Sequence, residues 1–236
     1  MNNVFMKPKE LKIHRYPMLA IESNMYFLIC EDSALVIDPN VNSDAIIFLK
    51  NAGVTNCVVF LTHEHFDHVS GVNAFRKSFD CHVICSPYTA KSLPDPSRNM
   101  AKYWDVLMMD KPPAIQKLGL KVKNEDYSCF ADEIIEKEED IVEWKNYKIR
   151  TVFAPGHSKG GMLFFLEDYG ILFSGDNLVN GTGVMYRFPG GSWKNYYEKT
   201  LPIIQNLPDD TVIYPGHGLP DKLKALRKYL VKFENK

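Results

Sequence analysis

Short apolar runs predict several strands in the N-terminal part of the chain. The runs are rich in β-branched and aromatic side chains, which favour extended structure, and polar or turn-forming residues separate them. Ser43 can cap a helix over residues 45–52, and Gly53 suits the C-terminal end of that helix. The predicted order is therefore strand, helix, strand. The predicted strands are residues 26–30, 35–38, 58–61 and 83–85.

The same pattern returns after Ile149 and predicts a second group of strands. One helix is expected after Ser192, running towards Leu207 with an interruption near Pro202. Another is expected from about Asp221 to Phe233, because leucines recur there at helical spacing. Strands and helices thus alternate in both halves of the chain. The strands of this group are residues 150–154, 162–166, 171–174 and 211–214.

Residues 87–140 differ in composition from the segments on either side. Five prolines divide this stretch into short helices and loops, and its acidic run at 132–140 is typical of a solvated face. Its Tyr, Trp and Met residues either line a substrate pocket or pack against the main domain. We therefore expect a lid-like helical insertion over a site.

Composition and charge narrow the classes of partner. The chain has 236 residues, with 28 Lys and Arg against 29 Asp and Glu and a formal net charge of -1. This balance gives no extended positive field for nucleic acid or an anionic membrane. No stretch approaches the roughly 18 apolar residues of a membrane span, residues 1–10 lack the apolar core of a secretory signal, and five cysteines without a C-x-x-C pair indicate reduced thiols. We expect a cytoplasmic protein with a small-molecule substrate and no nucleic-acid or membrane partner, and the oligomeric state stays open.

A dense group of His and carboxylate residues follows the predicted strand at 58–61. Burying three imidazoles and two carboxylates as a structural core is costly, because each needs a hydrogen-bond partner. As neutral donors, imidazoles bind zinc or iron well. A solvated polar loop is the alternative for this segment taken alone. The segment reads Thr62-His63-Glu64-His65-Phe66-Asp67-His68.

Three further candidate ligands, His157, Asp176 and His217, stand just after predicted strands. A glycine directly precedes each of them and permits a sharp turn. Binding sites in mixed sheets commonly gather at strand ends. The pattern therefore predicts that four strand ends converge on one site.

The combined pattern resembles the metallo-β-lactamase superfamily of metal-dependent hydrolases. The likeness covers nearly the whole chain and rests on His63-x-His65-x-Asp67-His68 followed by His157, Asp176 and His217. Residues 35–39, Gly156-His157-Ser158 and Pro215-Gly216-His217-Gly218 support it. The resemblance implies an α+β fold, a four-layer αββα sandwich of two mixed β-sheets with flanking helices, as a single domain over residues 1–236.

The resemblance also implies a centre with two divalent metal ions, with Zn²⁺ the leading candidate and Fe or Mn as alternatives. A hydroxide shared by the two ions would be the nucleophile. Asp67 is the expected catalytic residue, because it could also orient that hydroxide, and Asp38 is expected to support the ligands by hydrogen bonding. By this resemblance the first ion is held by His63, His65 and His157, the second by Asp67, His68 and His217, and Asp176 bridges the two.

Within the superfamily, the residues favour a metal-dependent hydrolase of a small ester, thioester, lactone or phosphodiester. The bridging Asp176 sets the chain apart from true β-lactamases, which lack that carboxylate. Only 19 residues follow His217, which leaves no room for the C-terminal domain of hydroxyacylglutathione hydrolases. Tyr186 and Arg187 are candidate contacts for substrate oxygens, with an ordinary surface loop as the alternative. A mononuclear iron persulfide dioxygenase and a non-catalytic metal-binding relative remain alternatives.

Overall fold

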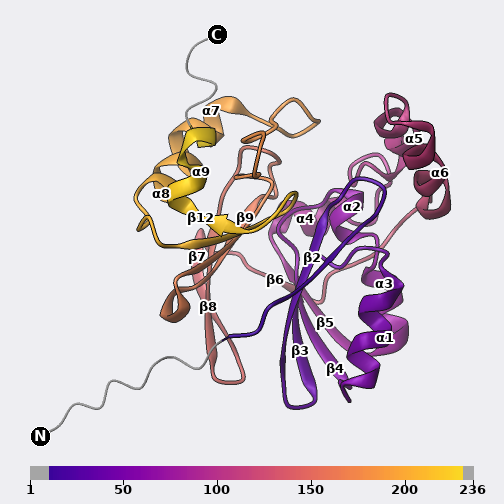
Figure 1. The fold of residues 1–236 in the computed structure, drawn as a ribbon, viewed down its shortest axis with the longest axis horizontal. Coiled ribbons are helices and arrows are strands. Elements are labelled where there is room, and N and C mark those ends of the chain that lie inside the picture. The colour runs from indigo at the N-terminus through magenta and orange to yellow at the C-terminus, as the bar shows by residue number, and fades with distance from the viewer. Residues whose placement is uncertain (1–10, 231–236) are drawn as a thin grey trace, which may run out of the picture.

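The computed structural model describes residues 11–230, in which two six-stranded sheets face one another (Figure 1). Each sheet comes from one continuous stretch of chain, so the boundary between them falls in the middle of the sequence. In order across the first sheet are β1 (His14–Pro17), β2 (Asn24–Cys30), β3 (Ser33–Ile37), β4 (Asn56–Phe60), β5 (Asp80–Cys85) and β6 (Glu133–Ile134). In order across the second are β12 (Asp221–Lys222), β11 (Val212–Pro215), β10 (Ile171–Gly175), β9 (Met162–Leu166), β8 (Tyr147–Phe153) and β7 (Glu139–Trp144).

Both sheets are mixed. In the first, β1, β2 and β3 pair antiparallel, and β3 through β6 pair parallel. In the second, β10 and β11 pair parallel, and the other neighbours pair antiparallel. The directions of β4, β8, β10 and β11 carry their C-terminal ends to the same edge of the sandwich. This is the edge at which the His and Asp residues of the sequence predicted a site.

Apolar side chains fill three layers of core. Between the sheets, Phe60 packs edge-on against Phe164 with ring centroids 5.1 Å apart. The outer face of the first sheet is covered by α1 (Ser43–Asn51) and α3 (Val72–Ser78), and that of the second by α8 (Leu201–Gln205) and α9 (Leu223–Leu230). The expected four-layer αββα sandwich is confirmed. Burial of these faces is the main driving force for the fold.

Every strand predicted from the apolar runs is present, with β9 at the expected bounds. Asn42, rather than Ser43, caps α1, because its side chain accepts a hydrogen bond from the backbone N–H of Asp44. The predicted helix after Ser192 is α7 (Trp193–Asn195), a π-helical turn at Tyr196–Thr200 and α8, so the helix passes Pro202 through a widened turn.

Other differences lie in short or edge strands. Apolar runs do not mark β1, β6 or β12. β7 begins within the acidic run at 132–140, whose acidic side chains are exposed or part-exposed, as expected of a solvated face. The helix predicted from Asp221 begins two residues later, after β12, and its predicted end at Phe233 lies outside the described residues. The expectation for residues 1–10 lies outside them too. Among the described helices, none has the length and apolar character needed to cross a membrane.

The segment after β5 forms a small helical unit on the first sheet. Trp104 lies in the core of this unit, where it is fully buried. Its indole Nε1 donates a hydrogen bond to the carbonyl of Gly119 at 2.9 Å. In Figure 1 the last two helices of the unit stand out from the body of the molecule. The unit contains α4 (Pro87–Ser92), the 3₁₀ turn η1 (Ala101–Tyr103), α5 (Trp104–Met108) and α6 (Pro113–Val122); a further 3₁₀ turn, η2 (Glu167–Tyr169), joins β9 to β10.

Candidate metal centre

The predicted ligands meet where strands of both sheets end. β4 leads into the His-rich segment and the short helix α2 (Phe66–Val69), and β8, β10 and β11 lead to the other candidates. All of the imidazoles and carboxylates concerned are buried, except that His217 is part-exposed. The structure therefore brings together the side chains that the sequence predicted as ligands, and their binding of metal stays a prediction. The residues brought together are His63, His65, Asp67, His68, His157, Asp176 and His217.

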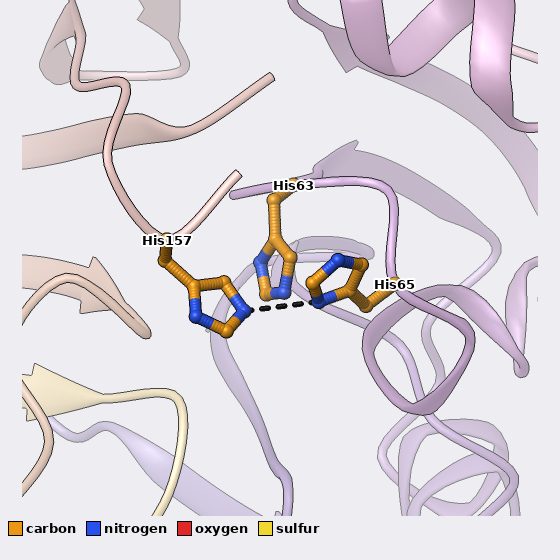
Figure 2. Close-up of side chains that lie close together, drawn as sticks. All are labelled: His63, His65 and His157. Carbon is orange, nitrogen blue, oxygen red and sulfur yellow. Dashed lines mark hydrogen bonds between the residues drawn. The ribbon is translucent and has the colours of Figure 1, made fainter. Parts of the chain in front are cut away.

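Three imidazoles form the first group. His63, His65 and His157 each offer a ring nitrogen, and these atoms all lie within 4.8 Å of one another. Figure 2 shows the three rings converging from two separate loops, with Nε2 of His157 2.9 Å from Nδ1 of His65. Three imidazoles arranged this way provide a typical set of ligands for zinc or iron.

A second group combines two imidazoles with a carboxylate. Oδ2 of Asp67 lies 3.2 Å from Nε2 of His68 and 3.2 Å from Nε2 of His217. Their potential ligand atoms also lie within 4.8 Å of one another. This group therefore has the size and composition to hold a second cation.

Asp176 lies between the two groups. Its Oδ2 is 3.5 Å from Nε2 of His157 in the first group and 3.4 Å from Nε2 of His217 in the second. Its Oδ1 is 3.5 Å from Nε2 of His68. One carboxylate thus faces both groups, which is the position needed to bridge two metal ions.

Gly216 makes this placement of Asp176 possible. A Cβ atom at position 216 would lie 2.0 Å from Oδ1 of Asp176 and 2.9 Å from Cε1 of His68. Any side chain there would displace the carboxylate or the imidazole. The glycine before His217, which the sequence suggested for its flexibility, is therefore required for space.

Hydrogen bonds on the outer side of the rings fix their orientation. Nδ1 of His157 donates to the carbonyl of Met185 at 2.5 Å, and Nδ1 of His217 donates to the carbonyl of Ile21 at 3.0 Å. The Thr62 hydroxyl donates to Asp38, so it accepts from Nδ1 of His63. With the Nδ1 atoms engaged, the Nε2 lone pairs of these rings point to the centre, as is usual for metal-binding histidines.

Several buried atoms at the centre make no hydrogen bond within the protein. Nε2 of His63, Nε2 of His68 and Oδ1 of Asp176 are buried and make no hydrogen bond. Leaving such groups unpaired is costly, so their convergence needs an explanation. A cation between them supplies one, and the donor set of imidazole and carboxylate fits a divalent transition metal.

The charge states also suit a cation. Burial lowers the pKa of the three imidazoles of the first group, that of His65 to about 3, so their nitrogen lone pairs are free. Burial alone would raise the pKa of Asp67 and Asp176, but nearby His68 and His217 outweigh it and hold both pKa values below the usual range. The first group therefore has neutral imidazoles beside ionised carboxylates, as metal ligation requires. In the second group Asp67 and Asp176 raise the pKa of His68 and His217 despite burial, so a bound cation would take the place of their protons.

Asp38 supports this centre from the end of β3. Its Oδ1 accepts from the Thr62 backbone N–H at 2.7 Å, and its Oδ2 accepts from the Thr62 hydroxyl at 2.6 Å and from Nδ1 of His68 at 3.0 Å. Asp38, His63 and His68 are also close enough to form a metal-sized group. Because both oxygens of Asp38 already accept these hydrogen bonds, its geometry is that of a positioning residue.

Glu64 is a buried residue of the His-rich segment, and the sequence alone assigned it no role. Its Oε2 accepts from the hydroxyls of Ser158 at 3.0 Å and Thr89 at 3.4 Å. Burial raises the pKa of Glu64 to about 7. The side chain joins the His63–His65 segment to α4 and to the loop that carries His157. Only the density of polar residues in the motif hinted at such a role.

A cavity of about 390 Å³ opens beside the centre, lined in part by His65, Asp67, His157, Asp176 and His217. Its volume falls within the range of about 300–1,000 Å³ usual for small-molecule sites. From the loop after Asp176, the lining residues include Met185 and Phe188.

The two substrate contacts predicted from that loop lie elsewhere. Neither Tyr186 nor Arg187 is among the residues that line the cavity. The Tyr186 ring packs against Trp193, with centroids 5.3 Å apart, and Arg187 is exposed. Their contact with a bound substrate stays a prediction.

The family model described as the metallo-beta-lactamase superfamily matches residues 20–217, which carry every ligand discussed above. The chain belongs to this superfamily. The likeness extends to curated metallo-hydrolases and to solved structures that share the metallo-β-lactamase fold.

Two curated members of the superfamily resemble most of the chain. "Probable metallo-hydrolase YqgX" of Bacillus subtilis is 27% identical over 209 residues, which cover 88% of this chain and 90% of the relative. "Hydroxyacylglutathione hydrolase GloC" of Haemophilus influenzae is 25% identical over 211 residues, which cover 88% of this chain and 91% of the relative.

The fold comparison agrees with the family assignment. The crystal structure of the BLEG-1 B3 metallo-beta-lactamase superimposes with a TM-score of 0.76 and 24% sequence identity. The match covers 95% of this chain and 100% of that one. At this identity the likeness shows a shared metallo-β-lactamase fold.

Proposed function

We propose that this member of the superfamily is a dinuclear metal-dependent hydrolase. Its first ion would be held by His63, His65 and His157, its second by Asp67, His68 and His217, with Asp176 between them. The observation that carries the proposal is the placement of Asp176, whose two oxygens face imidazoles of both groups at 3.4–3.5 Å.

The ions would supply Lewis-acid activation of the substrate and of a water molecule whose pKa falls towards neutrality. The residues of the chain have separate tasks. Asp67 lines the cavity, and its Oδ2 lies 3.2 Å from Nε2 of His68 and 3.2 Å from Nε2 of His217, so the carboxylate is placed to orient the attacking water and to accept its proton. Asp38 holds the His68 ring in the orientation that ligation needs.

The imidazole and carboxylate donors favour Zn²⁺, and they also suit Fe or Mn. The described cysteines are free thiols, which agrees with the reducing cytoplasm that the composition led us to expect. Metal identity in the cell depends on availability as well as on the ligands.

The expected substrate is a small ester, thioester, lactone or phosphodiester. The cavity is of small-molecule size. The names of the two curated relatives support hydrolysis, and that of GloC supports a thioester. GloC matches this chain over 91% of its own length, so the short segment after His217 does not weigh against thioester hydrolysis.

Metal analysis joined to a hydrolase panel tests the proposal. We expect about two metal ions per chain, and metal-dependent hydrolysis of at least one ester, thioester, lactone or phosphodiester. Asp67→Ala should abolish turnover while the protein stays folded, because it removes the carboxylate that orients the water. Protein that takes up no metal after reconstitution would contradict the proposed centre.

The panel also separates the alternative reactions. Oxygen consumption with glutathione persulfide by iron-loaded protein, without hydrolysis by zinc-loaded protein, would favour the persulfide dioxygenase. Two bound metals with no turnover on any substrate would favour the non-catalytic relative. Unchanged turnover in folded Asp67→Ala protein would refute the role given to Asp67.

A further inference from the structure

Apolar side chains form most of the wall of the cavity beside the metal centre. They come mainly from the helix α2, the helical unit between β5 and β6, and the loop after Asp176, and Ile21 adds one from the loop between β1 and β2. Such a wall favours an apolar group on the bound molecule. The main apolar lining residues are Phe66, Met100, Leu107, Val179, Met185 and Phe188.

Met100 is held in the wall by an unusual backbone conformation. It has φ 70°, in the left-handed region, and its side chain is only 6% exposed. The fully buried Asn99 stabilises this turn: its amide donates to the carbonyls of Leu93 and Tyr127, and its oxygen accepts from the N–H of Ala101. Non-glycine residues in this conformation are uncommon, and strain of this kind often marks ligand sites.

The helical unit is also tied to the metal-bearing helix. The Phe66 ring packs edge-on against Trp104 and Tyr127, with centroids 5.2 Å apart in each case. The Tyr127 hydroxyl donates a hydrogen bond to the carbonyl of Val69. Because α2 also carries Asp67 and His68, the wall built by Met100 and Leu107 has a defined position relative to the proposed metal ions.

The charges at the cavity do not favour a charged substrate group. Away from the metal centre, the charged lining residues in the described part of the chain are Lys111 and Glu22, one of each sign. A glutathione conjugate carries two carboxylates and one ammonium group, and proteins commonly bind such carboxylates through Arg or Lys side chains. The single lysine, offset by a glutamate, leaves the apolar wall as the dominant recognition surface.

We propose that the helical unit binds an uncharged, straight acyl chain of the substrate, and that Met100 and Leu107 set the chain length that is accepted. The substrate class is then an apolar acyl ester, thioester or lactone. This inference rests on the proposed hydrolase function, because it places the scissile group at the metal centre and the acyl chain against the wall.

A series of 4-nitrophenyl esters from acetate to decanoate tests the inference with the metal-loaded, full-length protein. Each methylene that reaches the wall should raise kcat/KM about threefold to fourfold, until the cavity is filled and kcat/KM falls. Met100→Gly should move the optimum to longer chains, since glycine accepts the backbone conformation and opens space. Leu107→Trp should move it to shorter chains.

Matched controls come from the same helical unit. Met109→Gly and Leu120→Trp alter residues that are 67% and 66% exposed and do not line the cavity. Both should leave the chain-length profile unchanged. Three results would overturn the inference. The first is an equal kcat/KM for all chain lengths, and the second is the same optimum in Met100→Gly and Leu107→Trp as in the wild type. The third is a preference for a hydroxyacyl thioester of glutathione over the octanoyl ester.

Calorimetric binding of alkanoates from butanoate to decanoate separates failure of this inference from failure of the proposed function. Affinity that rises with chain length, in protein that hydrolyses no ester, would support the acyl site and contradict the hydrolase. Rapid hydrolysis at a rate independent of chain length would support the hydrolase and contradict the acyl site. Absence of both hydrolysis and chain-length dependence would overturn both.

Discussion

The carboxylate of Asp38 lies 3.0 Å from Nδ1 of His68, and the same oxygen accepts a hydrogen bond from the Thr62 hydroxyl. The two residues are separated by 30 positions in the sequence. Through this contact, the end of β3 orients an imidazole on α2. The Thr62 hydroxyl continues the connection to His63, so one buried carboxylate influences the orientation of ligands in both groups.

Asp38→Asn should weaken metal binding at the second group. An amide presents one acceptor and one donor where the carboxylate presents two acceptors, so at least one of its hydrogen bonds is lost. Loss of such a partner usually lowers metal affinity about 10- to 100-fold. Competition with a chromophoric chelator measures this change. Asp168→Asn, in the exposed turn between β9 and β10, is the matched control and should bind metal like the wild type.

Gly216→Ala should weaken metal binding more than Asp38→Asn does. The added Cβ would lie 2.0 Å from Oδ1 of Asp176, so either the carboxylate or the end of β11 must move. We expect loss of at least one ion per chain and loss of hydrolysis, measured by elemental analysis and by the ester panel. Gly170→Ala is the control: φ there is 61°, with no heavy atom within 4 Å of the added carbon. It should cost about 1–2 kcal/mol of stability and keep both ions.

The sequence predicted the parts of the molecule that depend on local patterns. Apolar runs of strand length identified β2 through β5 and β8 through β11, because burial of a strand on both faces leaves a continuous apolar signal. The motif around His63, with the residues after later strands, predicted which side chains lie together at one edge of the sandwich. Its pattern was specific because metal ligation limits which residue types can serve.

Features that depend on long-range packing were not predictable in the same way. The edge strand β7 alternates exposed and part-buried residues before the buried Trp144 and carries acidic side chains, so its composition resembles a solvated loop. The lining of the cavity by Met100 depends on a turn held by Asn99, whose partners Leu93 and Tyr127 lie up to 28 residues away. Such long-range contacts leave no periodic pattern of apolar and polar residues in the sequence.

Asp132→Asn should destabilise the protein near neutral pH and have less effect in acid. Burial alone would raise the pKa of Asp132, but the Arg76 guanidinium and the Val83 N–H outweigh it and hold the pKa below its ordinary value of 3.8. A carboxyl group with a lowered pKa in the folded state adds stability above its unfolded pKa, and this stability is lost as the pH falls through the folded pKa.

We expect Asp132→Asn to cost about 1 kcal/mol at pH 7, with the difference from wild type shrinking below pH 3.8. Urea unfolding at pH 7 and at lower pH measures both values. Asp209→Asn breaks the more exposed ion pair with Arg227 and is expected to cost less. An effect of Asp132→Asn that is equally large in acid would show that it does not arise from the ionised carboxylate.

Glu64→Ala should disturb the first metal group without removing a ligand. The buried Oε2 accepts from Ser158, which directly follows His157, and from Thr89 on α4. Thr89 has a second acceptor in the carbonyl of Gly160, whereas the Ser158 hydroxyl would lose its acceptor and keep only the hydrogen bond that it accepts from the Gly160 N–H. We expect a loss of about 1–3 kcal/mol in the free energy of unfolding, together with weaker metal binding because the loop carrying His157 is less constrained.

Glu64→Gln keeps an acceptor oxygen of nearly the same shape and should restore most of the stability and the metal affinity. Glu143→Ala, on the exposed side of β7, controls for loss of a carboxylate and should leave both unchanged. Unfolding in urea and chelator competition at the first group are measured on the same preparations. If Glu64→Ala lowers stability but leaves the affinity of the first group intact, Glu64 only stabilises the fold. A loss of affinity that Glu64→Gln reverses assigns it to the positioning of His157.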